Sequence, residues 1–112
     1  MSTQKFKEMN LQQEQWWAEA QKDENAVFLD VRTSEEFERG IIPNAINIDI
    51  YKGQGFIYLL DELDKAKSYY VYCHAGSRSA KACEIMRQMG FEKTFNLVGG
   101  MSNWKGPIVE PN

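Results

Sequence analysis

The sequence predicts an α/β protein in which helices cover both faces of an open parallel β-sheet. Segments with the pattern of strands alternate with segments that have the pattern of helices along the whole chain, as is typical of such sheets. The run Ala26–Val31 is apolar except for Asp30, which fits a strand buried on both faces. The length of 112 residues fits one domain. We therefore expect a single domain over residues 1–112, with a core over about 6–104 and a loose C-terminal tail over 107–112.

The N-terminal part predicts a helix followed by the buried strand. Asn10 can cap a helix over Leu11–Lys22. Trp16 and Trp17 are adjacent on this helix and cannot both face inward, so we expect one in the core and the other half exposed. The strand Ala26–Val31 comes next.

A capping box follows that strand. Thr33 can accept a hydrogen bond from the backbone N–H of Glu36, whose side chain can reach back to Thr33. The short helix that it opens should run to Arg39, with Gly40 ending it. The alternating segment Ile46–Ile50 then predicts a short strand.

The second half continues the alternation of helices and strands. We expect a helix over Phe56–Leu63, a strand over Ser68–Tyr72, a helix over Arg78–Met89, a strand over Thr94–Leu97, and a short helix that begins at Gly99–Gly100 and carries Trp104. The apolar stripe of the helix after Arg78 consists of Ala82, Cys83, Ile85, Met86 and Met89. Parallel sheets bind ligands beyond the C-terminal ends of their strands, and Cys73 follows directly on one of them.

The composition excludes several kinds of partner. A net charge of −3 and a sequence pI of about 5.2 provide no basic face for nucleic acid or for an anionic membrane. No segment has the roughly 18 consecutive apolar residues of a membrane helix, and the N-terminus lacks the apolar core of a secretory signal. Two cysteines are too few for a disulfide scaffold and indicate a reducing compartment. We expect a cytoplasmic protein.

The segment Cys73–Arg78 carries the chemistry that we predict. A strand, a loop with Gly76 and a helix opening near Arg78 would direct several backbone N–H groups at one point. Such a loop, with a helix dipole behind it, binds anions and holds the pKa of a cysteine below the usual ~8.5. Arg78 adds a permanent positive charge. A thiolate that a second anion can approach is suited to covalent group transfer.

Three other interpretations of this loop are weaker. An inert buried cysteine needs neither a glycine-bearing loop nor a following arginine. Cys73 and His74 are adjacent, Cys83 is remote and the chain has one histidine, so no spacing typical of zinc is present and we expect no metal. Phosphatase-type loops have one residue more between cysteine and arginine, and the tighter ring here fits a single sulfur atom better than a phosphoryl group.

These residues resemble the rhodanese homology domains, and closely the single-domain thiosulfate sulfurtransferases. The loop matches the highly specific pattern Cys-x-x-Gly-x-Arg-Ser after a strand. Weaker matches in the same order are Leu29–Arg32 with Glu35–Phe37, Gly40–Ile48, Gly90–Phe91, and Leu97–Gly100 followed by Trp104. The resemblance spans about Phe6 to Trp104. Ile41 stands where the family often has histidine, which we interpret as a variation in packing.

The resemblance implies a reaction without a metal or organic cofactor. Cys73 would take the sulfane sulfur of a small anionic donor such as thiosulfate, hold it as a persulfide, and pass it to a thiophilic acceptor such as cyanide or a thiol. Arg78 would orient the loop and bind the donor, while Asp30 and Arg32 would give structural support. The backbone N–H groups that would hold the persulfide come from His74, Ala75, Gly76, Ser77 and Ser79.

The roles of some neighbouring side chains stay open. His74 is either a base or, because neighbours in a tight loop usually point apart, a residue that lines the loop. Ser77 and Ser79 are expected to satisfy backbone groups at the start of the helix. The residues expected near the entrance are Tyr51, Lys52 and Phe56.

Four functions compete on this evidence. The first is an enzyme that transfers sulfane sulfur between small molecules, and the second is a sulfur-relay module whose partner is a sulfur-accepting protein. The sequence does not separate these two. A noncatalytic interaction domain is disfavoured by the intact loop, and phosphatase-like or arsenate-reducing chemistry is disfavoured by its short length.

Overall fold

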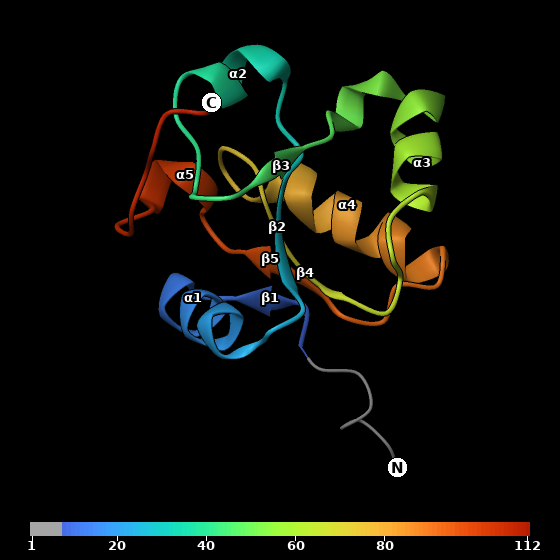
Figure 1. Cartoon of the computed structure of the whole chain (residues 1–112), viewed down its shortest axis with the longest axis horizontal. Coiled ribbons are helices and arrows are strands. Elements are labelled where there is room, and N and C mark those ends of the chain that lie inside the picture. The colour runs from blue at the N-terminus through green and yellow to red at the C-terminus, as the bar shows by residue number, and fades with distance from the viewer. Residues whose placement is uncertain (1–7) are drawn as a thin grey trace.

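The computed structural model describes residues 8–112 as a five-stranded parallel sheet with helices on both faces (Figure 1). Its strand order is β1-β5-β4-β2-β3, so the strand before Cys73 is central. The strands are β1 (Asn10–Leu11), β2 (Ala26–Asp30), β3 (Ile46–Asn47), β4 (Ser68–Tyr72) and β5 (Thr94–Leu97). The helices are α1 (Gln13–Lys22), α2 (Ser34–Glu38), α3 (Gln54–Asp61), α4 (Ser77–Gln88) and α5 (Gly100–Asn103). The predicted fold class is confirmed; Phe6, where the predicted core begins, lies outside the described residues.

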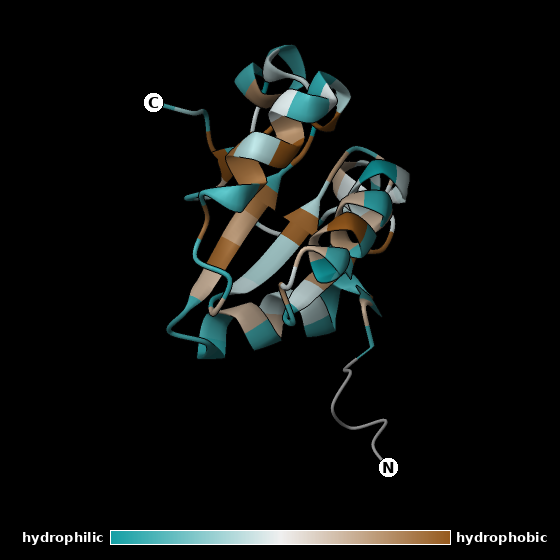
Figure 2. Ribbon diagram, turned by 90° about the vertical axis from the view of Figure 1, so that its right-hand side faces the viewer, coloured by the Kyte–Doolittle hydropathy of each residue, from teal (hydrophilic) through white to brown (hydrophobic). Residues whose placement is uncertain are grey.

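Two hydrophobic clusters, one on each face of the sheet, bury the central strand. Tyr69 and Val71 of β4 belong to the cluster under α3 and α4, which also contains Cys73. Tyr70 and Tyr72 point the other way, into the cluster under α1 and α5. Figure 1 shows these two pairs of helices on opposite sides of the sheet, and Figure 2 shows one long strand of the sheet coloured as hydrophobic along most of its length. All five residues of β4 are buried because helices cover both faces of this central parallel strand.

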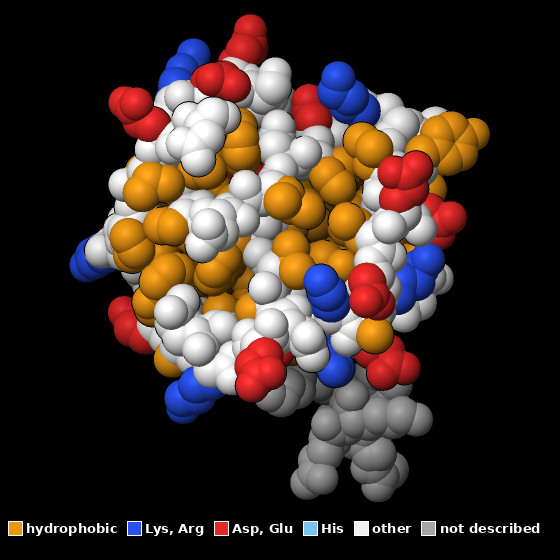
Figure 3. All heavy atoms as spheres, viewed as in Figure 1, with side chains coloured by type: hydrophobic (Ala, Val, Ile, Leu, Met, Phe, Trp, Pro, Cys, Tyr) orange, Lys and Arg blue, Asp and Glu red, His pale blue; other side chains and the backbone are white. Residues whose placement is uncertain are grey.

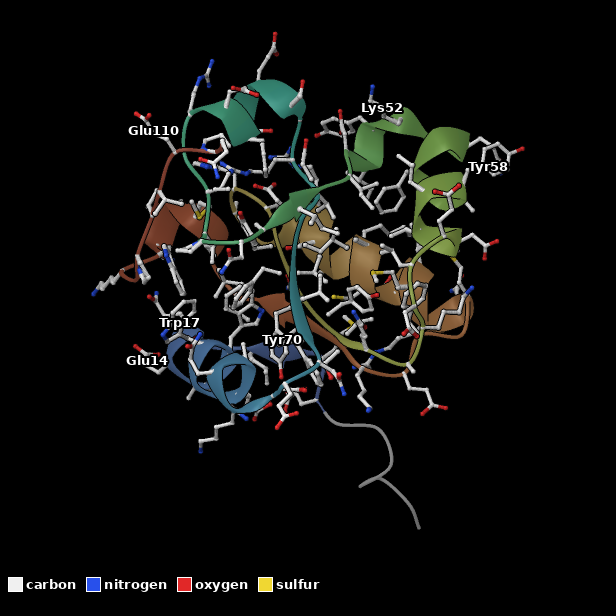
Figure 4. All side chains as sticks on the ribbon, viewed as in Figure 1. Glu14, Trp17, Lys52, Tyr58, Tyr70 and Glu110 are labelled. Atoms are coloured by element: carbon white, nitrogen blue, oxygen red, sulfur yellow. The ribbon has the colours of Figure 1, made fainter. Side chains whose placement is uncertain are left out.

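The two adjacent tryptophans divide as predicted. Trp16 is fully buried, and its Nε1 donates a hydrogen bond to the carbonyl oxygen of Phe95 at 3.0 Å. Trp17 is half-buried at the side of α1, where it stacks on Phe28 and meets the ring of Trp104 edge-on (Figure 4). Trp16 therefore fills the interior of the cluster under α1, and Trp17 covers its edge.

The first helix begins two residues later than predicted, and Asn10 does not cap it. Gln12 occupies the N-cap position and makes no side-chain cap bond. Asn10 and Leu11 instead form β1, which pairs in parallel with Asn96 and Leu97 of β5. The prediction was wrong because this long-range pairing makes Leu11 a strand residue, so the helix begins only at Gln13. The side chain of Asn10 accepts a hydrogen bond from Nδ2 of Asn96.

Other elements agree with the sequence to within a few residues. The capping box of Thr33 and Glu36 is present at the start of α2, and the bounds of β4 and β5 are as predicted. The predicted strand Ile46–Ile50 is wrong beyond Asn47, because Asp49 accepts a hydrogen bond from the backbone N–H of Tyr51 and turns the chain into a short 3-10 helix, Ile50–Lys52. No helix within the described residues is long and apolar enough to cross a membrane.

The segment 107–112 is attached to the domain and is not the loose tail that we predicted. Val109 forms an antiparallel bridge with Ile41, with both N–H···O distances at 2.8 Å. The indole Nε1 of Trp104 also donates to the carbonyl oxygen of Pro107 at 3.0 Å. The short segment with two prolines gave no sign of this, because the partner of Val109 lies 68 residues earlier in the chain. Ile41 is buried against this segment.

Candidate active site

Cys73 lies at the C-terminal end of the central strand and is 1% exposed. The loop that follows it runs between α2 and α5 before it enters α4 (Figure 1). Gly76 ends the loop with a φ of 103°, a conformation that side chains with a Cβ rarely adopt. A Cβ at Gly76 would also lie 3.1 Å from the backbone nitrogen of Gly99. The glycine is thus required both by the turn and by the close approach of the segment before α5.

Three hydrogen bonds converge on the sulfur of Cys73. The backbone N–H of Gly76 donates to Sγ at 3.1 Å, and the N–H and hydroxyl of Ser79 each donate at 3.3 Å. Burial by itself would raise the pKa of Cys73. The hydroxyl of Ser79, its N–H, and the N–H groups of Gly76 and Ala75 outweigh burial and hold the pKa below its ordinary value. The site therefore favours a thiolate.

The first turn of α5 fixes the orientation of the loop. The N–H of Met101 donates to the carbonyl oxygen of Cys73, and the N–H of Ser102 donates to that of His74, both at 2.9 Å. A Cβ at Gly100 would lie 2.5 Å from each of these two carbonyl oxygens, so the approach needs glycine. Because α5 holds the carbonyl groups on one side of the loop, the N–H groups of the loop face the other side, where the sulfur lies.

Arg78 is paired with Glu36 across the site. Its Nη1 and Nη2 donate to the two carboxylate oxygens of Glu36 at 2.8 and 3.0 Å. The Arg78 hydrogen bond lowers the pKa of Glu36 to about 2, against a smaller opposing effect of burial, with further help from the N–H of Thr33. The same pairing raises the pKa of Arg78, whose guanidinium also lies 5.4 Å from the centre of the Tyr51 ring.

Sequence reasoning placed Glu36 in the capping box but missed its pairing with Arg78. The two residues are 42 positions apart, so no local pattern joins them. A usable signal was available in the fold class. Glu36 follows β2 and Arg78 follows β4, and neighbouring parallel strands end at one edge of the sheet. An acid after one strand is therefore a candidate partner for a base after the next.

Asp30 and Arg32 form a second, more deeply buried ion pair. Arg32 Nη2 lies 2.7 Å from Asp30 Oδ2, and the side chains are 7% and 0% exposed. Arg32 Nη2 also donates to the carbonyl oxygen of Gly40 at 2.8 Å. Burial opposes the charge on Arg32, but the hydrogen bonds and charge of Asp30 outweigh it and raise the pKa of Arg32. The pair thus ties the end of β2 to the segment after α2.

A cavity of about 360 Å³ lies beside the loop, lined by Arg32, Glu36, Arg39 and His74. His74 is exposed and makes no hydrogen bond to Cys73 Sγ among the described contacts, so its ring belongs to the cavity wall. Arg39 is exposed as well, and no described residue forms an ion pair with it. With Glu36 held by Arg78, this wall presents an excess of positive charge and hydrogen-bond donors to the cavity.

The remaining predicted residues are placed less closely. Ser77 and Ala75 are exposed at the start of α4, whose N-cap is Gly76 without a side-chain bond. Ser79 is fully buried, and its hydroxyl contacts the carbonyl oxygen of Gly76 as well as the sulfur. Lys52 points outward from the protein (Figure 4). Phe56 is 1% exposed and packs in the core, so the expectation that it lines the entrance is wrong.

The second cysteine makes none of the described hydrogen bonds to Cys73 and packs in the same hydrophobic cluster. Cys83 is fully buried on the inner face of α4, and burial raises its pKa to about 12. Both cysteines are free thiols. Within residues 8–112, no three His, Cys, Asp or Glu side chains are grouped so that they would hold a metal ion.

Comparison with known proteins gives consistent findings. The Rhodanese-like domain family matches residues 13–107. The chain is 32% identical over 84 residues to the thiosulfate sulfurtransferase GlpE of Coxiella burnetii, covering 75% of this chain and 76% of that protein. It is 37% identical to the "Putative sulfur carrier protein YrkF" of Bacillus subtilis, over 75% of this chain and 44% of that longer protein. A rhodanese-like domain protein of Staphylococcus aureus has a similar structure, with a TM-score of 0.79 at 27% identity, covering 94% of this chain and 100% of that one.

Proposed function

This chain belongs to the rhodanese-like domain family and is a sulfurtransferase, and we propose that it moves the sulfane sulfur of thiosulfate through a persulfide on Cys73. The thiolate of Cys73 attacks the outer sulfur of thiosulfate. As the Sγ–S bond forms, the S–S bond of the donor breaks and sulfite leaves with the electron pair. The negative charge then lies on the outer sulfur of the persulfide.

A thiophilic acceptor completes the cycle. Cyanide attacks the outer sulfur, the Sγ–S bond breaks, and its electron pair returns to Cys73 as a thiolate while thiocyanate leaves. A thiol acceptor would take the sulfur in the same way and leave as a persulfide. Neither half of the cycle requires a metal or an organic cofactor.

The observation that carries this proposal is the set of hydrogen bonds that converge on Cys73 Sγ. They come from Gly76 and Ser79 and stabilise negative charge on the sulfur before any donor binds. The N–H groups of Ser77 and Arg78 in the first turn of α4 have no acceptor within the helix, so they are available to the outer sulfur of a persulfide. We assign the cradle to the loop backbone from His74 to Ser79, including Ala75 and Ser77.

The ion pairs around this cradle suggest separate roles for the arginines in orienting the loop and in binding the donor. Because Arg78 binds Glu36 through both of its amino groups, we assign it the task of orienting the loop. We assign reception of the anionic donor to the adjacent cavity, where Arg39 and His74 are available as donors. Asp30 and Arg32 support the strand end on which the loop is built.

A sulfur relay to a protein partner is the second candidate. It is favoured by the similarity to a protein named as a sulfur carrier, of which this chain spans less than half. Two large aromatic side chains are also exposed. Tyr51, whose ring lies beside Arg78, is 69% exposed, and Tyr58 of α3 is 66% exposed and points away from that helix (Figure 4). Figure 3 shows hydrophobic side chains beside charged ones on the face of the molecule in view. Steady-state rates with small acceptors, compared with rates of transfer to a protein acceptor, separate the two.

Mass spectrometry tests the shared step. After incubation with thiosulfate and removal of the donor, the intact protein should gain the mass of one sulfur atom, which cyanide should remove. Fragmentation should place this atom on Cys73. Cys73→Ser should abolish the adduct and the turnover and keep the fold, because the two side chains are nearly the same size. Sulfur transfer by Cys73→Ser, or an adduct on Cys83, would refute the proposal.

A further inference from the structure

The hydroxyl of Ser79 faces three acceptors in the buried region behind the thiol. Its Oγ lies 3.3 Å from Cys73 Sγ, 3.3 Å from the carbonyl oxygen of Gly76, and within hydrogen-bond distance of Oδ1 of Asn96. Ser79 is 0% exposed and Asn96 is 3% exposed. Because a serine hydroxyl carries one proton, it can donate to only one of these acceptors at a time.

The amide of Asn96 is held in one orientation by its other neighbours. Its Nδ2 donates to Oδ1 of Asn10 at 2.9 Å and to the carbonyl oxygen of Gly76 at 3.2 Å. Since a carbonyl oxygen can only accept, the NH₂ group must face Gly76, and Oδ1 must face Ser79. The backbone of Asn96 is fixed within β5, which lies between β1 and β4.

The competition for the proton is between the sulfur and Asn96. Gly76 does not need Ser79, because its carbonyl oxygen already accepts from the N–H of Ala80 at 3.1 Å and from Asn96. Among the described contacts, Oδ1 of Asn96 has the Ser79 hydroxyl as its donor. Each time the hydroxyl turns to the sulfur, a buried amide oxygen therefore loses its hydrogen bond.

We propose that Asn96 is a positioning residue that accepts the Ser79 proton when Cys73 Sγ is uncharged and yields it to the sulfur when Sγ is a thiolate. In the thiol, the hydroxyl bonds to Asn96. In the thiolate, it turns to Sγ. In the persulfide, the charge has moved to the outer sulfur, so the hydroxyl returns to Asn96. This sequence rests on the proposed function, in which Cys73 carries the sulfur.

Asn96 thus opposes the free thiolate and favours the sulfur-loaded enzyme. Its amide oxygen is satisfied in the persulfide and unsatisfied in the thiolate, so the site gains a hydrogen bond when sulfur is taken up. The effect passes entirely through Ser79, because Asn96 makes no hydrogen bond of its own to Cys73 among the described contacts.

A double-mutant cycle tests this coupling by titration of the free enzyme. The readout is the midpoint of the pH profile for alkylation of Cys73 in the wild type, Ser79→Ala, Asn96→Ala and the double variant. Ser79→Ala should lower the acid dissociation constant of Cys73 about tenfold, because the thiolate loses a donor. Asn96→Ala should raise it about threefold, because the hydroxyl is then always free for the sulfur. In the double variant, the loss of Asn96 should have no further effect.

The cycle has internal controls. Asn10→Ala removes an acceptor of Nδ2 and leaves Oδ1 facing Ser79, so the midpoint should not change. If Asn96→Ala does not fold, Asn96→Val suits a buried strand and carries the same prediction. Burial raises the pKa of Cys83 to about 12, so its alkylation does not overlap.

The charged groups around Cys73 are the same in every variant. They are Arg78 on α4 with its partner Glu36 on α2, and the pair of Asp30 and Arg32 at the end of β2. The titratable side chain of His74 in the loop is also unchanged. The inference would be overturned if Asn96→Ala raised the midpoint pH for alkylation of Cys73. It would also be overturned if Asn96→Ala shifted this midpoint equally in the wild type and in Ser79→Ala. The titration uses no sulfur donor, so its result is independent of the adduct experiment that tests the proposed function.

Discussion

Glu36→Gln is the substitution whose effect the structure defines best. The carboxylate of Glu36 binds both amino groups of Arg78 and also accepts from the backbone N–H of Thr33 at 3.1 Å. Glutamine keeps the shape of the side chain but removes the charge. The variant therefore leaves the guanidinium of Arg78 without its counter-charge in a site where the two side chains are only 19% and 25% exposed.

The pKa of Glu36 gives the size of the expected loss in the free energy of unfolding. A fall from the ordinary 4.5 to about 2 corresponds to an upper limit of about 3 kcal/mol, at about 1.4 kcal/mol for each pH unit. Solvent screening of a partly exposed pair reduces this value, so we expect the free energy of unfolding to fall by about 2 kcal/mol at pH 7. For a domain of this size, that corresponds to a melting temperature lower by roughly 8 °C.

The pH dependence gives the sharper test. Because the folded-state pKa of Glu36 is depressed, its contribution is fully present above about pH 4.5 and is lost as the pH falls toward about 2. Urea denaturation at several pH values should show the wild type and Glu36→Gln converging over this range, since a protonated glutamate is neutral as well. Glu38→Gln, an exposed change on the same helix, should stay within about 0.5 kcal/mol of the wild type. If the difference in unfolding free energy between the wild type and Glu36→Gln does not become smaller as the pH falls, the reasoning is refuted.

Three further predictions concern the loop, the second thiol and the cavity. Gly100→Ala places a Cβ 2.5 Å from the carbonyl oxygen of Cys73, so it should displace the loop and reduce kcat at least tenfold, as measured by thiocyanate formation. Cys83→Ala should cost about 1 kcal/mol in urea denaturation, because it removes a buried sulfur, and should leave turnover near that of the wild type; a large loss of turnover at unchanged stability would contradict its place in the core. Arg39→Gln should raise KM for thiosulfate about tenfold and leave the pH profile for alkylation of Cys73 unchanged. The control Lys22→Gln, at the other end of the sheet, should change neither KM nor this profile.

Local patterns in the sequence were sufficient for most of the fold. The alternation of apolar runs and helical stripes predicts a parallel sheet covered on both faces, and β4 and β5 have the predicted bounds. The capping box of Thr33 and Glu36 was also predictable, because its hydrogen bonds join residues three positions apart. The same kind of reasoning placed Cys73 at the end of a strand, followed by a turn at Gly76. These features depend on the conformational preferences of residues that are neighbours in the sequence, so they can be inferred from the residue types alone.

Partners that are far apart in the chain were decided by the tertiary structure. The sequence offered Asn10 a helix to cap, but the alignment of β1 with β5 made it a strand residue and placed it beside Asn96. For Glu36, local spacing indicated its partner Thr33, but its pairing with Arg78, 42 residues away, depends on the order of β2 and β4 in the sheet. The physical reason is that hydrogen-bond and charge partners are chosen by distance in the folded chain. Residues such as Asn96 and Ser79 meet only after strand order and register have brought β5 against the start of α4.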